Sequence, residues 1–171
     1  MEKGLRKEGK FVSIQAPLYD EMPEVAKLWA DAQTMKAVGG AIVFSKERWK
    51  DWYRQMVEPT DGQNQYCLVY NQSNEVVGEV SFHRFNQISK MADFNIKIYD
   101  HHRRKGYAKE AMRLMMDYYF NEFGGEILRD EVINEKGQQA LSNFGFEMMM
   151  KTEQGLLFEM TKTRFTSLRM P

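Results

Sequence analysis

The change from strand to helix that organises this chain falls at Arg103-Arg104-Lys105-Gly106-Tyr107-Ala108. Before these residues, segment 92–99 alternates polar and apolar side chains, which is the period of a β-strand. After them, apolar residues recur at helical spacing as far as Gly124-Gly125, a pair that is typical of a helix end. A further strand is predicted at 127–133. The order strand, helix, strand predicts a right-handed crossover and a parallel pair of strands.

The segments on either side complete an α/β fold. Upstream, strands are predicted at 66–70 and 76–85, and the short connections that lead on to 92–99 predict antiparallel pairing. The remaining predicted elements are a strand at 11–18, helices that begin near Asp20 and at Ser45, a helix from Asn134 to Gly145-Phe146, and a hairpin of 147–153 with 156–162. We therefore expect a mixed, mostly antiparallel sheet of about seven strands with helices on both faces.

Length and composition fit one globular domain. The chain has 171 residues, and its 43% hydrophobic and 28% charged residues exclude a disordered or fibrous protein. We expect a polar N-terminal lead-in at 1–10 and a single domain at 11–171. Lys and Arg together number 24, as do Asp and Glu, and the resulting zero net charge argues against a protein that binds duplex DNA.

Several sequence features indicate a soluble, cytoplasmic protein. Residues 1–10 are charged and lack the apolar core of a signal peptide, and the longest aliphatic stretches, such as 41–44, are far too short to span a bilayer. The single cysteine, Cys67, excludes an intrachain disulfide and a multi-cysteine metal site, and it favours a reducing compartment. His101 and His102 are adjacent on what we expect to be an extended segment, so we expect their rings to point apart, which argues against a metal site that they would share with His83. We expect neither membrane association nor a bound metal.

The residues from Arg103 to Ala108 carry the strongest chemical signal. A helix N-terminus presents unpaired N–H groups and a partial positive charge, which together bind phosphate. Gly106 permits a turn or a close approach that a Cβ would block, and the small Ala108 leaves the neighbouring wall open. The three basic residues add charge-assisted donors. The combination favours a bound pyrophosphate, although a solvated basic turn is the alternative. Neither GxGxxG nor GxxxxGK[ST] occurs in the chain.

Three motifs in register make the sequence similar to the GNAT N-acetyltransferase superfamily. The acetyl-CoA pyrophosphate loop of that superfamily has the form [RQ]xxGx[GA], which Arg103-x-x-Gly106-x-Ala108 fits. Segment 92–99 matches the strand that precedes the loop. One helix later, Asn134 begins a helix that ends in Gly145-Phe146, again with the spacing of the superfamily. The resemblance covers about residues 11–162.

The resemblance implies a set of residues that bind acetyl-CoA. In the superfamily the strand before the loop splays from its parallel neighbour, and pantetheine lies in the cleft between them. By position, Ile96 and Ile98 would offer their backbones to pantetheine, and Asn134 would contact the cofactor or the acceptor end of the cleft while also capping its helix. The residues implied to hold the pyrophosphate are Arg103, Arg104, Lys105, Gly106, Tyr107 and Ala108.

The reaction implied is direct attack of an amine on the acetyl thioester, which requires a base to take a proton from the amine. Asp93 occupies the superfamily position at which an acidic residue often does this; it could equally be an exposed strand carboxylate. Glu79 is a second candidate and could instead bind a cationic acceptor. His83 is a third, although a lone histidine is more often structural. Cys67 could act as an acyl relay, but its strand setting favours packing.

Leu141 is a clear departure from the superfamily pattern. Many members carry a tyrosine at this position, seven residues after the asparagine, and that tyrosine protonates the leaving CoA thiolate. A thiolate is already a tolerable leaving group, because the pKa of a thiol is ~8.5. The departure therefore weakens the expected catalysis without excluding it. It also favours an alternative, a non-catalytic acyl-CoA-binding or sensing module.

The function we expect is transfer of an acetyl group from acetyl-CoA to a primary amine of a small molecule or of a peptide or protein N-terminus. The acceptor surface would include four aromatic residues of the first two helices, of which we expect at least two to belong to the core: Trp29, Trp49, Trp52 and Tyr53. The basic turn lacks an adjacent aromatic platform, which argues against nucleic acid as a partner. A homodimer is compatible with the sequence, which does not determine the assembly or the acceptor.

Overall fold

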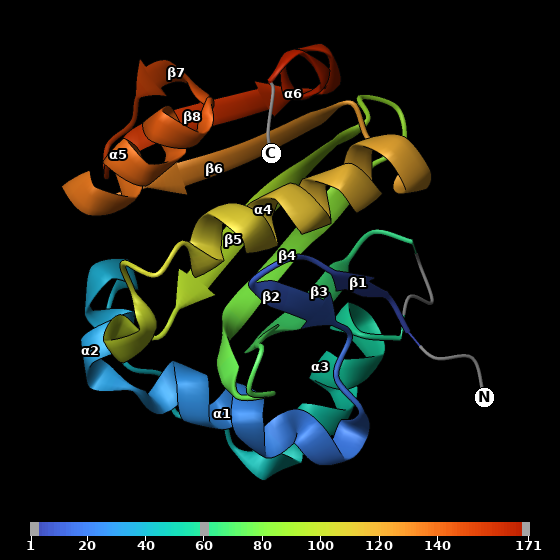
Figure 1. Cartoon of the computed structure of the whole chain (residues 1–171), viewed down its shortest axis with the longest axis vertical. Coiled ribbons are helices and arrows are strands. Elements are labelled where there is room, and N and C mark those ends of the chain that lie inside the picture. Colours follow the sequence, from blue (N-terminus) through green and yellow to red (C-terminus); the bar gives the residue numbers. More distant parts are fainter. Residues whose placement is uncertain (1–3, 59–61, 169–171) are drawn as a thin grey trace.

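The computed structural model describes residues 4–58 and 62–168, which form one eight-stranded mixed sheet with helices on both faces (Figure 1). The strand order is β1-β2-β3-β4-β5-β6-β8-β7. Every neighbouring pair is antiparallel except β5 and β6, which are parallel. In chain order the strands are β1 (Arg6–Glu8), β2 (Val12–Gln15), β3 (Gln65–Asn71), β4 (Val76–Asn86), β5 (Met91–Ile98), β6 (Ile127–Val132), β7 (Glu147–Lys151) and β8 (Leu156–Thr161).

The described α-helices are α1 (Met22–Ala30), α2 (Ala32–Met35), α3 (Trp49–Met56), α4 (Tyr107–Tyr118), α5 (Glu135–Phe144) and α6 (Lys162–Ser167). Short 3-10 turns precede α1, follow α2, and precede α3; a fourth, η4 (Asp100–His102), follows β5. A π-helical turn, Tyr119–Phe123, continues α4 to Gly124, whose positive φ of 100° ends the helix.

The predicted architecture is confirmed, with additions at both ends of the chain. The seven predicted strands correspond to β2 through β8, and the parallel pair predicted from the crossover is β5 with β6. The eighth strand, β1, lies in the segment expected to be a polar lead-in. Its sequence, Arg6-Lys7-Glu8, shows no apolar alternation because β1 is an edge strand whose side chains are largely exposed.

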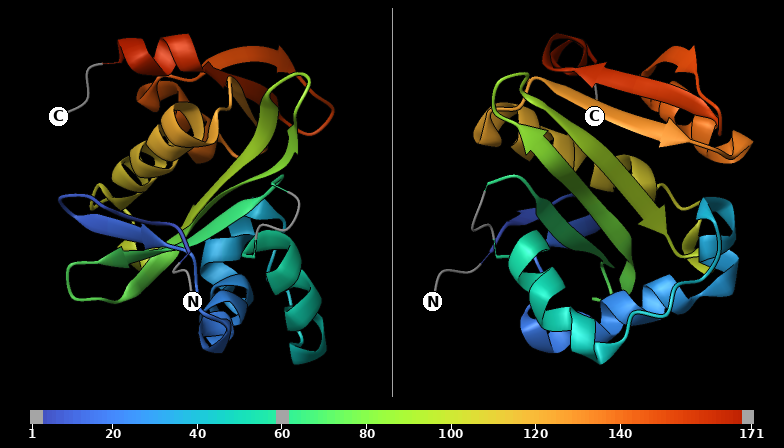
Figure 2. Two further views of the ribbon diagram at one scale, coloured as in Figure 1. Left: turned by 90° about the vertical axis from the view of Figure 1, so that its right-hand side faces the viewer. Right: turned by 180° about the vertical axis from the view of Figure 1, so that it is seen from behind.

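The helices cover the sheet in two layers (Figure 2). Each layer has its own core. On one face α4 packs over β2, β4 and β5, and Met112, Met115 and Tyr119 of α4 with its π turn join the larger buried cluster. On the other face the first helices of the chain cover β3, where Tyr66 and Leu68 belong to a second cluster. Alternate residues of β3 therefore serve different cores, as a strand buried on both faces requires.

The feature that positions the site is a fork between β5 and β6. The two strands pair only from Met91↔Ile127 to Asp93↔Arg129 and then diverge, as Figure 2 (right) shows. On its other side β5 stays paired with β4 as far as Ile98↔Gly78. The edge of β5 beyond Asp93 thus has no strand neighbour on the side of β6, and an extended chain that carries amide groups can bind along such an edge.

Candidate active site

The N-terminus of α4 lies at the open end of the fork and carries donors that are free for a ligand. Gly106, the residue before the helix, has a φ of +80°, and no side chain of the described residues caps the helix. Within the described residues, no acceptor takes the N–H groups of residues 107–109. Apart from its neighbours in the chain, no atom of residues 4–58 or 62–168 would lie within 4 Å of a Cβ placed on Gly106, so the space beside it is open. Such a helix N-terminus favours an anion.

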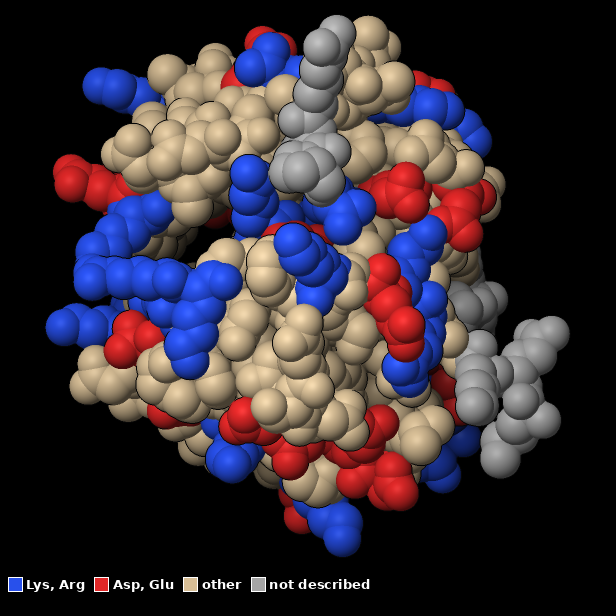
Figure 3. All heavy atoms as spheres, viewed as in Figure 1, with Lys and Arg blue, Asp and Glu red and all other residues tan. Residues whose placement is uncertain are grey.

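A hollow of about 340 Å³ lies between this loop and α5. Ile98, Gly106 and Met112 line one side of it, and Asn143 and Phe144 of α5 line the other. Figure 3 shows the hollow on this face of the molecule, with Lys and Arg side chains gathered beside it. The hollow is therefore apolar inside and basic at its rim, which suits a ligand with a phosphate end and a less polar body.

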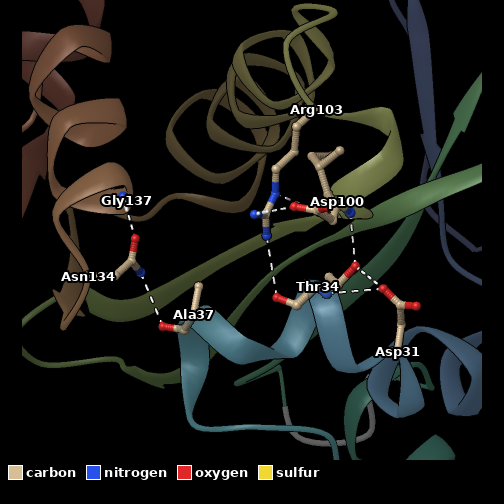
Figure 4. Close-up of polar contacts among 8 residues, drawn as sticks. Asp31, Thr34, Ala37, Asp100, Arg103, Asn134 and Gly137 are labelled. Carbon is tan, nitrogen blue, oxygen red and sulfur yellow. Dashed lines mark hydrogen bonds and ion pairs between the residues drawn. The ribbon is translucent and has the colours of Figure 1, made fainter.

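The three basic residues of the loop differ in what they contact. Arg103 is occupied within the protein, because its guanidinium donates to Ile98 O (3.3 Å), Asp100 Oδ1 (3.1 Å) and Thr34 O (3.4 Å) (Figure 4). Arg104 and Lys105 are exposed. Arg104 adopts a positive φ of 67°. Of the three, Arg104 and Lys105 are the ones whose charges remain available to an anion, whereas Arg103 braces the loop.

A chain of hydrogen bonds fastens the same loop to α2. The Thr34 hydroxyl accepts from the Asp100 amide (2.9 Å) and donates to Asp31 Oδ2 (2.5 Å), and Asp31 caps α2 through the Thr34 amide. The hydrogen bond from Thr34 is the main cause that lowers the pKa of Asp31. Figure 4 shows these residues between α2 and the turn that precedes Arg103. The α2 segment is thus held beside the open end of the fork.

Asn134 acts as a cap and also reaches across this end of the fork. Its Oδ1 accepts from the Gly137 amide (2.7 Å), which caps α5, and its Nδ2 donates to Ala37 O (3.2 Å) in the turn after α2 (Figure 4). The expected capping role is therefore present. The side chain of Ile96 packs against the larger cluster, and Ile98 lines the hollow beside α4, while the backbones of both residues lie in the part of β5 that is not paired with β6.

The two carboxylates expected to act as bases are both occupied. Asp93 lies where the fork opens and accepts from Arg84 Nε (2.6 Å) and Nη2 (2.5 Å). Glu79 is only 2% exposed. It accepts from four donors, namely Trp29 Nε1 (2.5 Å), Asn95 Nδ2 (2.6 Å), Tyr66 Oη (3.1 Å) and Lys97 Nζ (3.4 Å). Both oxygens of Glu79 and the Oδ2 atom of Asp93 therefore already accept from donors.

A second cavity, of about 420 Å³, opens where the strands part, and Asp93, Asn95 and His83 line it. The Nδ1 atom of His83 is buried and finds no hydrogen-bond partner in the described part of the chain, and burial lowers the pKa of its imidazole. The cavity also contains Asp130 of β6, which the sequence analysis did not single out. Burial raises the pKa of Asp130 to about 8. The charged run Arg129-Asp130-Glu131 inside the strand predicted at 127–133 is the signal that could have indicated Asp130.

Other residues considered from the sequence lie within the two buried clusters or pack against them. Cys67 is fully buried, and burial raises the pKa of its thiol well above the ordinary range. Trp29 and Trp52 pack edge to face with ring centroids 5.5 Å apart, against the second cluster. Trp49 and Tyr53 pack against the same cluster. Leu141 is 2% exposed within the larger cluster.

Two further surveys cover the described residues alone. Among them, no three His, Cys, Asp or Glu side chains are grouped so that they could hold a metal ion. None of the helices at 4–58 or 62–168 combines the length and the apolar character needed to cross a membrane.

Comparisons with known proteins agree with this geometry. The sequence model of the acetyltransferase (GNAT) domain family matches residues 14–147. Spermidine N-acetyltransferase from Vibrio cholerae, solved in complex with CoA and spermine, is 16% identical; the match covers 91% of this chain and 98% of that chain, with a TM-score of 0.78. An acetyltransferase (GNAT family) from Bacillus anthracis is 14% identical over 93% of this chain and 99% of its own, with a TM-score of 0.72. At such identities the likeness shows a shared fold. A search of curated proteins finds no match.

Proposed function

Because the chain belongs to the acetyltransferase (GNAT) domain family, we propose that it transfers an acetyl group from acetyl-CoA to a primary amine of a small molecule or of a peptide or protein N-terminus. The observation that carries the proposal is that two features of the structure lie next to each other. The free N–H groups of α4 beside Gly106 lie at the open end of the fork between β5 and β6. The N-terminus of α4, which would bind phosphate, thus lies next to the free edge of β5, so that one extended ligand could contact both.

The residues at hand fit acetyl-CoA along that path. The N–H groups of α4, together with Arg104 and Lys105, would hold the pyrophosphate. The hollow between α4 and α5 would take neighbouring parts of the molecule, and the backbone of β5 at Ile96 and Ile98 would hold the amide-bearing pantetheine. Acetyl-CoA supplies the acetyl group as a thioester, so no metal is needed to activate it.

The cavity at the fork is the place for the acceptor. It adjoins the free edge of β5 and is lined by polar side chains that include Asp93, Asp130 and Glu131. Arg84 is paired with Asp93, and Arg129 is paired with Glu159 (3.1 Å), so two of the cavity's cations are already neutralised. The carboxyls that remain favour a positively charged acceptor, such as an alkylammonium. The spermidine N-acetyltransferase from Vibrio cholerae, which has a similar fold, was solved in complex with spermine, an amine.

A second function, an acyl-CoA-binding or sensing module without catalysis, follows from one observation. Leu141 has no ionisable proton and lies in the core, so this position supplies no general acid. The two functions share the α4 site and differ in turnover alone.

An acetyl-CoA turnover screen separates them. The purified chain is given acetyl-CoA and a panel of diamines, polyamines, amino acids and peptides with free N-termini. Release of the CoA thiol is followed by absorbance, and the acceptor is examined by mass spectrometry. We expect thiol release above the hydrolysis background together with an N-acetylated product for at least one amine class. Tight CoA binding with no acetylated product across the whole panel would reject the transferase and leave the binding module.

A further inference from the structure

Asp130 occupies a distinctive place in the sheet, because it is the first residue of β6 beyond the fork. The last pair that joins β5 to β6 is Asp93↔Arg129, and one residue later β6 is paired only with β8, through Asp130↔Phe158. The side chain of Asp130 lines the cavity of about 420 Å³ that the diverging strands leave. A carboxyl group therefore stands at the point where the free edge of β5 begins.

The Asp130 carboxyl also differs from its neighbours in having no partner. Within the described residues, no donor lies within hydrogen-bond or ion-pair distance of it. Arg84 pairs with Oδ2 of Asp93, and both oxygens of Glu79 accept from donors, so of these three carboxyls Asp130 alone has no donor on either oxygen among the described residues. A group that removes a proton must be able to form a hydrogen bond to the atom that carries it. Asp130 meets this requirement.

The charges around Asp130 determine its protonation. Within the cavity and next to it are Asp93 and Lys97 of β5, His83 and Arg84 of β4, and Arg129 and Glu131 of β6. Burial is the main cause that raises the pKa of Asp130 to about 8; Lys97 lowers this value and Asp93 raises it. A carboxyl with a pKa near the working pH both gains and loses a proton readily, and an incoming ammonium would favour its ionised form.

We propose that Asp130 is the catalytic base that takes the proton from the acceptor's ammonium at the fork. The inference rests on the acetyltransferase function proposed above and adds a residue to it. The acceptor R–NH₃⁺ gives one proton to Asp130, and the freed lone pair on nitrogen forms the bond to the acetyl carbon while the C–S bond breaks and its electron pair leaves on sulfur. A second proton passes from nitrogen to sulfur, the third stays on the amide, and Asp130 releases its proton to water.

The variant that tests the proposal is Asp130→Asn, which keeps the shape and removes the proton acceptor. We expect kcat with the best amine to fall roughly 100-fold at about pH 7, the lower end of what a general base contributes, while the affinity for CoA stays within threefold. The deficit should shrink below about tenfold near pH 10, because a growing share of the amine, whose pKa is ~10, is then already unprotonated in solution. If Asp130 had only a structural role, the loss of kcat in Asp130→Asn would not change with pH.

Two comparison variants sharpen the result. Glu126→Gln removes a carboxylate just before β6 and should leave kcat within twofold at both pH values. Asp93→Asn releases Arg84, and its effect on the rate should be the same at both pH values. Turnover of Asp130→Asn within threefold of wild type at pH 7 would overturn the assignment and leave the proposed function standing. Absence of turnover in the wild type with every amine would overturn both.

Melting temperatures give a readout that needs no turnover. Between the ordinary carboxyl pKa of ~3.9 and a raised value of about 8, the folded state holds a proton that the unfolded chain has released, so stability contributed by Asp130 is lost as the pH rises through that window. The Asp130→Asn variant has no carboxyl at this position, so it does not lose stability in this way as the pH rises. Its Tm relative to wild type should therefore rise steadily from about pH 5 to about pH 8.5. A difference that stays constant over that range would contradict a half-buried Asp130 without a partner, and so the proposal.

Discussion

Substitutions at Leu141 allow the contributions of packing and of proton transfer to be measured separately at one position. It is 2% exposed in the core beside Phe144, at the position where the superfamily resemblance leads one to expect a tyrosine. Leu141→Ala should lower the free energy of unfolding by ~2–5 kcal/mol, because a buried leucine is replaced by a cavity. Turnover by the folded variant should stay within about tenfold of wild type, because no proton is lost from the site. Denaturant unfolding and steady-state kinetics measure the two quantities.

The complementary variant tests the same position from the other side. Leu141→Tyr supplies a phenol where the chain has none, and we expect turnover at neutral pH that is not reduced. If the Ala variant folds and binds CoA yet loses nearly all activity, Leu141 contributes to catalysis by a route other than proton donation. Turnover that appears only in the Tyr variant would favour the binding-module function for the natural chain.

For single residues, the sequence could indicate candidate catalytic bases but not the donors that their carboxylates contact. The alternation of 92–99 places Asp93 on the polar face, and the β-rich run 76–85 places Glu79 on the neighbouring strand. What decides their chemistry is that Arg84 holds Asp93 and that Trp29 from α1 reaches Glu79. These contacts depend on strand register and on helix packing, which the residue pattern does not contain. Asp130 was missed for the same reason, since its importance lies in where β5 and β6 part.

Among the elements, the N-terminus of α4 allows a well-controlled test of the CoA site. Gly106 and Gly124 stand at opposite ends of α4 and its π turn, both with positive φ, and at neither would a Cβ meet an atom within 4 Å. Valine at either position costs similar backbone strain. Gly106→Val also fills the space beside the free N–H groups, so it should weaken CoA binding at least tenfold, whereas Gly124→Val should leave the affinity within twofold.

Calorimetry with CoA measures both affinities, and circular dichroism checks that both variants fold. Equal affinities for the two variants would remove the pyrophosphate from the α4 terminus. The element itself was predicted closely from sequence, since the change of period near Gly106 and the Gly124-Gly125 end are local signals. The short α2 was not predicted, because four residues capped by Asp31 give no periodicity to detect.

For the whole molecule, the sequence predicted the fold class and the order of elements better than the shape of the site. The crossover through α4 required a parallel pair, and β5 and β6 are that pair. The number of paired residues before the strands diverge, and the reach of Asn134 to Ala37 across the opening, come from the packing of α2 and α5 around the fork. β1 was missed because an exposed edge strand needs no apolar face.

The central claim is that acetyl-CoA binds along one path, from the N-terminus of α4 to the free edge of β5. Hydrogen–deuterium exchange with and without CoA tests it most directly, because it reports where the ligand shields backbone N–H groups. We predict slower exchange in peptides that cover 94–98 and 104–109, and unchanged exchange in the edge strand β7, which lies outside that path. Protection that leaves 94–98 unaffected, or that falls mainly on β7, would contradict the claim.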